Sequence, residues 1–137
     1  MIVHGMCPSA KEEFFQGVHQ PKDLYMLALY NEVAGLGPQT TVYETEDEAY
    51  GKGYTAGGAA LKGYTTGIVN NVAYLTWTDP VIWTNVSVST PGGLVYNRSK
   101  GNKAIAVFDF GDLLTAKNGT LIVTMPPKGA GALILWG

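Results

Sequence analysis

The sequence predicts a mainly β protein, an antiparallel β-sandwich with one short N-terminal helix. Short apolar segments separated by turn residues follow one another from residue 40 to the C-terminus, as in a sandwich or barrel. Residues 82–89 alternate with the period of two of a strand. Glycine, with 18 of 137 residues, has about twice its usual share and marks turns. Strand order is not visible in a list of strands, so jelly-roll and immunoglobulin-like arrangements both remain open.

The N-terminal part contains the only helix that we expect. Ser9 is a candidate N-cap with Glu12 three positions later, as in a capping box, and Pro21 stops a helix over residues 9–20. Residues 1–8 are apolar and too few to fold alone. They are expected to form an arm that lies on a neighbouring molecule.

The rest of the chain is expected to be strands and loops. Residues 23–30 form a continuous apolar run, which favours a buried strand. Further strands are expected at residues 40–44, 68–76, 81–89, 93–97, 104–110, 120–125 and 132–136, with turns at 99–103, 118–119 and 126–129. The glycine-rich residues 51–63 predict a loop that allows close backbone approach, and the acidic residues 44–48 predict a solvated loop or a contact with a basic partner.

Size and charge limit the possible functions. A chain of 137 residues and 14.6 kDa is expected to form a single domain, residues 1–137. Its 46% hydrophobic content and net charge of −2 argue against disorder and against a nucleic-acid partner. We expect no membrane partner, because no run approaches 18 apolar residues, and no secretory signal. One cysteine cannot form an internal disulfide, which fits a reducing compartment.

No catalytic, cofactor-binding or metal-binding residue is predicted, so the chain is expected not to be an enzyme. His4, Cys7 and His19 are the only soft ligands and are too few for a typical zinc site, and they make a weak nucleophile–base set. The pair Asp109 and Asp112 is read as the end of a strand and a turn, in which Asp112 accepts backbone hydrogen bonds. Two carboxylates at this spacing also suit acid–base work in a small hydrolase. Residues 51–63 lack the Gly-Lys-Ser/Thr of a phosphate loop.

The aromatic residues admit two interpretations. Trp77 and Trp83 bracket Asp79-Pro80, and Tyr54 lies in the glycine-rich segment. Such residues pack a core or a protein interface, or they form a carbohydrate-binding platform when they are exposed. We favour core or interface and keep the carbohydrate-binding β module as the alternative.

Several motifs in a fixed order carry a resemblance to a known family. They are GKGYTAGGAALKG at residues 51–63, LVYN at 94–97, AVFDFGD at 106–112 and NGT at 118–120. This pattern resembles a family of small structural proteins of tailed-bacteriophage virions. At residues 89–93 the chain has Ser-Thr-Pro-Gly-Gly where the family pattern has a small residue, Arg and Gly, so no role of that arginine carries over.

The resemblance implies a capsid decoration, or cement, protein. Such a protein binds across junctions of major capsid protein subunits and stabilises the head. It implies a location on the capsid surface of the virion, after synthesis in the host cytoplasm. A homotrimer is expected from the rotational symmetry of capsid junctions. A neck, tail or head-fibre component is the alternative within the virion. The expected interface residues are Met1, Ile2, Val3, Met6, Tyr54 and Trp83.

Overall fold

The protein is mainly β, with two antiparallel sheets and one short helix, as the sequence predicts. The structure is a computed structural model that describes residues 1–136, with Trp136 described by its backbone alone. The elements are β1 (Gly5–Met6), α1 (Pro8–Phe15), β2 (Tyr25–Tyr30), β3 (Ala59–Ala60), β4 (Tyr64–Val69), β5 (Val72–Trp77), β6 (Val81–Asn97), the 3₁₀ turn η1 (Arg98–Lys100), β7 (Lys103–Val123) and β8 (Ile134–Trp136). One sheet has the order β1-β7-β6-β2-β3 and the other β4-β5-β8.

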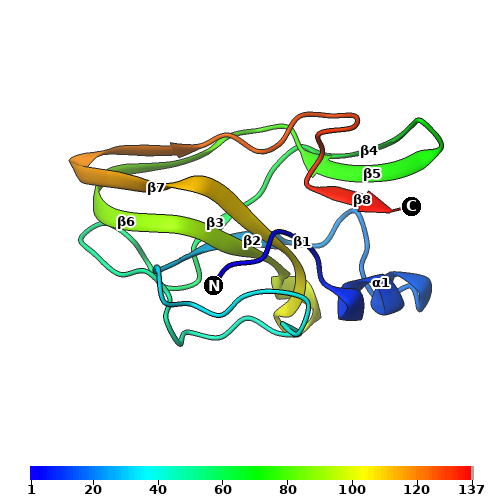
Figure 1. The fold of residues 1–137 in the computed structure, drawn as a ribbon, viewed down its shortest axis with the longest axis horizontal. Coiled ribbons are helices and arrows are strands. Elements are labelled where there is room, and N and C mark those ends of the chain that lie inside the picture. Colours follow the sequence, from blue (N-terminus) through cyan, green and yellow to red (C-terminus); the bar gives the residue numbers. More distant parts are fainter. Residues whose placement is uncertain (137) are drawn as a thin grey trace.

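The centre of the fold is the long hairpin of β6 and β7. The four strands expected over residues 81–89, 93–97, 104–110 and 120–125 are two strands, paired from Val81↔Val123 to Asn97↔Lys103. Figure 1 shows this hairpin turning back on itself at one end. The register shift between Thr90 and Gly92 marks this corner, where residues 110–113 on β7 oppose a single residue of β6. We call residues 81–90 with 114–123 the outer arm, and residues 92–97 with 103–109 the inner arm.

Glycine and asparagine produce bulges in this hairpin where the sequence indicates turns. Asn118 has a φ of 47° and Gly111 a φ of 81°, and both lie inside β7. The expected turn at residues 118–119 is therefore wrong: Gly119 pairs with Val86 across the ladder. An extra residue in one strand increases the local bend without ending the pairing. The local sequence pattern therefore predicts four strands where the chain forms two.

The core lies between the two arms and around β2. Every residue of β2 is buried, which confirms the buried strand expected at residues 23–30. Leu27 and Leu29 of β2 and Leu94 and Val107 of the inner arm are fully buried. Burying a leucine side chain contributes roughly 2 kcal/mol. The apolar run without alternation is thus explained, because both faces of β2 are covered.

The glycine-rich loop lies against the backbone of β2 and of the outer arm. Gly51, Gly53 and Gly58 all have positive φ. A Cβ at Gly51 or Gly53 would run into carbonyl oxygens of β6, and one at Gly58 would run into the carbonyl oxygen of Leu27. The close backbone approach in this loop is thus made to strands of the same chain, and residues 59–60 pair with β2 as strand β3.

Two other expected strands differ from the structure. Residues 40–44 contain only the isolated bridge Val42↔Lys103 and no strand. Residues 68–76 are parts of two strands, because Asn70 and Asn71 both have positive φ and form the two-residue turn between β4 and β5.

The helix is shorter than the expected span of residues 9–20. It begins with Pro8 at its first turn and Cys7 as N-cap, and its C-cap is Gln16. Ser9 therefore does not cap it, because β1 leads directly into Pro8, whose fixed φ suits the first helical position. Gly17, with a φ of 74°, ends it one turn before Pro21.

Replacing Gly58 by alanine is expected to destabilise the domain. The new methyl group would meet the Leu27 carbonyl, and the residue would have to keep a φ of 81°. We expect the free energy of unfolding to fall by roughly 2–4 kcal/mol in urea denaturation. Gly35→Ala is the control, since Gly35 has no atom within 4 Å of the added methyl group. Equal stability of the two variants would contradict the close approach.

Candidate functional site

The N-terminal residues expected to form an arm lie on their own domain. The Met1 ammonium donates to the Ala34 carbonyl at 2.9 Å, and the Val3 amide donates to the Leu36 carbonyl at 2.8 Å. Residues 5–6 form β1 and pair with β7. The pairing occurs because β7 presents an open edge to this segment. Met1 and Val3 keep exposed side chains, whereas Ile2 and Met6 pack against the core.

Tyr54 and Trp83, the other expected interface residues, are turned inward. Trp83 is only 7% exposed and contacts the Tyr54 ring at a centroid distance of 6.3 Å. The Tyr54 hydroxyl accepts the Leu29 amide at 2.9 Å and donates to a Glu48 carboxylate oxygen at 2.5 Å. Trp83 is thus buried where the outer arm meets the glycine-rich loop, whereas Tyr54 is partly buried and is held to β2 and to Glu48 through its hydroxyl.

Glu48 lies in an environment very different from the one that the sequence predicts. It belongs to the acidic segment expected in solvent, yet it is 8% exposed. Its carboxylate accepts hydrogen bonds from the Tyr43 hydroxyl at 2.5 Å, the Tyr54 hydroxyl at 2.5 Å and the Gly57 amide at 2.8 Å. Burial raises the pKa of both tyrosines, and their hydrogen bonds to Glu48 raise it further. Three donors make the buried carboxylate an anchor for the loop.

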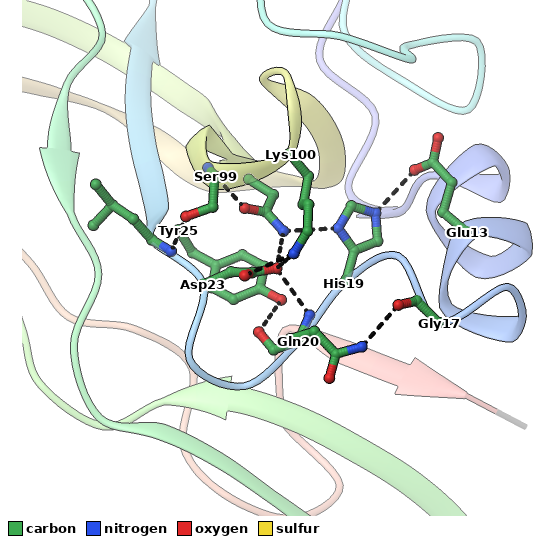
Figure 2. A network of polar contacts seen from close by, with 10 residues as sticks. Glu13, Gly17, His19, Gln20, Asp23, Tyr25, Ser99 and Lys100 are labelled. Carbon is green, nitrogen blue, oxygen red and sulfur yellow. Dashed lines mark hydrogen bonds and ion pairs between the residues drawn. The ribbon is translucent and has the colours of Figure 1, made fainter.

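A second buried polar network joins α1 to η1 (Figure 2). Asn97 donates to His19 Nδ1 at 2.9 Å and to Asp23 Oδ2 at 2.8 Å. His19 Nε2 lies 2.9 Å from Glu13, and Lys100 Nζ lies 2.9 Å from both Asp23 oxygens. Because the Asn97 amide nitrogen only donates, His19 Nδ1 accepts and Nε2 carries the proton toward Glu13.

The charge on Asp23 is held by this network. Desolvation raises the pKa of Asp23, but hydrogen bonds from Asn97, Lys100 and the Gln20 amide, together with the Lys100 charge, lower it to about 2. The Asp23 side chain is 5% exposed. The network thus fixes residues 17–23, which have no regular secondary structure, and it orients His19.

His19 in turn supports the wall of an apolar groove. The Phe14 ring packs on the His19 ring at 4.9 Å between centroids. Across from α1, the β4–β5–β8 sheet extends beyond the core, at the right of Figure 1. The space between them has a volume of about 480 Å³ and is lined chiefly by Met6, Phe14, Tyr64, Ile68, Leu75 and Ile134. We call it the overhang groove.

A second apolar surface lies on the outward face of the outer arm. Ile82 and Ile122 are register partners, and each is about half exposed. Thr84 lies two positions from Ile82 on β6, Thr120 lies two positions from Ile122 on β7, and both threonines are also exposed. The four side chains therefore share one face of the hairpin. Trp83 points to the core from the other face. We call these four residues the outer hairpin face; none of them is charged.

His4 and Asp109, two of the residues considered for chemistry, have structural partners. His4 Nδ1 accepts the Asp109 amide at 3.1 Å, and Asp109 Oδ1 accepts the Gly111 amide at 2.9 Å. It is therefore Asp109 that accepts a backbone hydrogen bond, where Asp112 was expected to do so. Asp109 lies inside β7 and not at the end of a strand. Within residues 1–136, no three His, Cys, Asp or Glu side chains are grouped so as to hold a metal ion. No helix in the described part is long and apolar enough to cross a membrane.

Comparison of the sequence with protein-family models and with curated proteins, and of the structure with solved structures, returned no match.

The Cys7 thiol is expected to be unreactive in the folded protein. It is 1% exposed, and burial, with a smaller effect from the Glu13 charge, raises its pKa to about 11. The thiolate that attacks disulfide reagents is therefore scarce and inaccessible at pH 8. Titration with Ellman's reagent should detect no thiol in buffer and one thiol per chain in guanidinium chloride. Rapid reaction without denaturant would refute this burial.

Asp23→Asn tests the polar network through its pH dependence. A carboxyl group whose pKa is lowered by folding stabilises the protein above its ordinary pKa of 3.8, and this stabilisation disappears as the pH falls to about 2. At pH 7 we expect the free energy of unfolding to drop by about 2 kcal/mol. The difference from the unmodified protein should shrink between pH 4 and about 2. Urea denaturation over this range measures it. Exposed Asp112→Asn should show neither effect.

Proposed function

We propose that this chain is a structural protein of a tailed-bacteriophage virion that decorates the head. In this role it binds major capsid protein subunits across their junctions on the capsid surface. The resemblance of residues 51–63 and 106–112 to that family supports the proposal at the level of sequence. The observation that carries it at the level of geometry is the outer hairpin face, with its paired Ile82 and Ile122.

The outer hairpin face suits binding to a large protein surface. It is uncharged, and it combines two isoleucine side chains with threonine hydroxyls that form hydrogen bonds at little desolvation cost. Its backbone is held from behind by buried Trp83 and Leu121. A preformed face loses little conformational entropy on binding, so more of the contact energy appears as affinity.

Binding at a junction increases the effect of modest contacts. A subunit that touches two shell proteins forms its second contact at a high effective concentration. Separation of the shell proteins then requires that these contacts break as well, which opposes the pressure of packaged DNA. The N-terminal residues contribute through the exposed side chains of Met1 and Val3 and not as a free arm.

The two tryptophans that suggested the carbohydrate-binding alternative do not favour it. A sugar-binding platform needs aromatic rings that stand in solvent, whereas Trp77 and Trp83 are 1% and 7% exposed. A neck, tail or head-fibre position remains the alternative, because the same face suits any large protein partner.

The copy number in purified particles distinguishes these positions. Quantitative mass spectrometry should find hundreds of copies per particle for a shell protein, and roughly a dozen or fewer for a component of the neck or tail axis. Absence of the chain from particles would refute the proposal.

Attachment should depend on the outer hairpin face. We expect Ile122→Lys to weaken binding to undecorated particles by about tenfold or more, since a lysine placed in an apolar contact must be desolvated. Co-sedimentation of full-length protein with particles measures this. Val33→Lys, at a 74% exposed site elsewhere, is the matched control and should bind normally. Equal binding of both variants would exclude this face.

A further inference from the structure

Strand β4, at one edge of the β4–β5–β8 sheet, is longer and more regular than the short strands at the other sheet margins. Two strands at sheet margins, β1 and β3, have two residues each, and β8 has three. In the outer arm, β7 also presents an edge, but it is interrupted by bulges and carries Lys117. By contrast, β4 has six residues and pairs with β5 without a register shift. Short edges, bulges and lysines are the devices that prevent pairing between sheets, and β4 has none of them.

The β4–β5 hairpin itself is uncharged as well. No Asp, Glu, Lys, Arg or Pro occurs in residues 64–78. Ile68, near the end of β4, is 78% exposed and lines the overhang groove. An uncharged strand with free backbone donors and acceptors and an exposed isoleucine is suited to extend its sheet onto another strand.

The turn between β4 and β5 determines which backbone groups of β4 are free. Asn70 and Asn71 form a two-residue turn, so the flanking Val69 and Val72 are a hydrogen-bonded pair. Hydrogen bonding to β5 then recurs at every second residue. The amide and carbonyl groups of Tyr64, Thr66 and Ile68 therefore point away from β5, toward the open edge.

We propose that β4 pairs with β4 of a second copy of this chain, antiparallel and about a two-fold axis at Thr66. The two three-stranded sheets then form one continuous sheet of six strands. Thr66 faces Thr66 of the second copy, and Ile68 faces Tyr64 of the second copy. The three free residues on each strand supply donors and acceptors to each other.

The second copy is the occupant because this edge is complementary to itself. An antiparallel pair about a two-fold axis matches every free donor with an acceptor and closes after two chains. The side chains of Tyr64, Thr66 and Ile68 lie on the face that lines the overhang groove. Pairing thus brings each Ile68 to the groove of the other copy. A net charge of −2 per chain opposes this approach only weakly.

This self-pairing does not depend on attachment to a virion, because β4 and the outer hairpin face are different surfaces. It predicts two chains where the symmetry of capsid junctions suggested three. Ile122→Lys should therefore leave self-association unchanged, and Ile68→Lys should leave one-to-one contacts with the shell intact. Failure of either proposal can be recognised independently of the other.

Sedimentation equilibrium of the full-length chain tests the pairing. We expect a monomer–dimer equilibrium whose dissociation constant rises about tenfold or more in Ile68→Lys and stays unchanged in Val33→Lys. Both sites are highly exposed aliphatic positions, so neither variant disturbs the core. A monomer at all concentrations, a trimer, or a dimer insensitive to Ile68→Lys would overturn the proposal.

A cysteine at the two-fold axis tests the register. Facing residues in an antiparallel hydrogen-bonded pair have Cα atoms about 5.5 Å apart, which a disulfide spans. Thr66→Cys should form a covalent dimer under mild oxidation, while Val33→Cys should remain monomeric on a non-reducing gel. The native Cys7 is buried and does not interfere. A dimer in solution without this cross-link would show that another surface associates, and would refute pairing through β4.

Discussion

The hydrogen-bonded ladder between β6 and β7 is the constraint on which the rest of the structure depends. It joins residues 81 and 123 at one end to residues 97 and 103 at the other, and its corner turns one hairpin into two layers. The inner arm supplies neighbours for β1 and β2, and the outer arm covers the core with Trp83. A bulged strand bends without losing its pairing, so a chain of this size builds a sandwich around one continuous hairpin.

Two buried polar centres hold the segments that this ladder does not reach. Glu48 collects three donors and fastens the glycine-rich loop over β2 and the outer arm. Asp23, Asn97 and His19 fasten the segment between α1 and β2 to η1. Irregular backbone lacks a ladder of its own, so its position depends on such bonds, and a buried charge is tolerated only when its partners are complete. Through Phe14 and His19, the second centre also shapes the overhang groove.

The surface separates into regions with different physical character. The outer hairpin face is uncharged and already hydrogen-bonded within its hairpin, so it offers side chains to a partner. The edge of β4 offers backbone groups instead, and these select an extended strand. One chain can use both at once, since attachment and self-pairing draw on different groups. In the proposed role, this separation lets one chain bind a second copy and the capsid surface together.

The sequence by itself determined the mainly β class, the helix near the N-terminus, the buried strand before Tyr30 and the structural use of the glycines in residues 51–63. These follow from local composition and periodicity, which act over a few residues. Only the tertiary structure decided that residues 118–119 are a bulge, that Glu48 is buried, that Trp83 faces the core and that residues 1–8 lie on their own sheet. Each of these depends on a distant partner: Val86 for Gly119, two tyrosines for Glu48, β2 and its loop for Trp83, and the free edge of β7 for β1. A local sequence pattern carries no information about which distant group will contact it. That tertiary contact determines the free-energy cost of burying a charge and the free energy gained by pairing a strand edge.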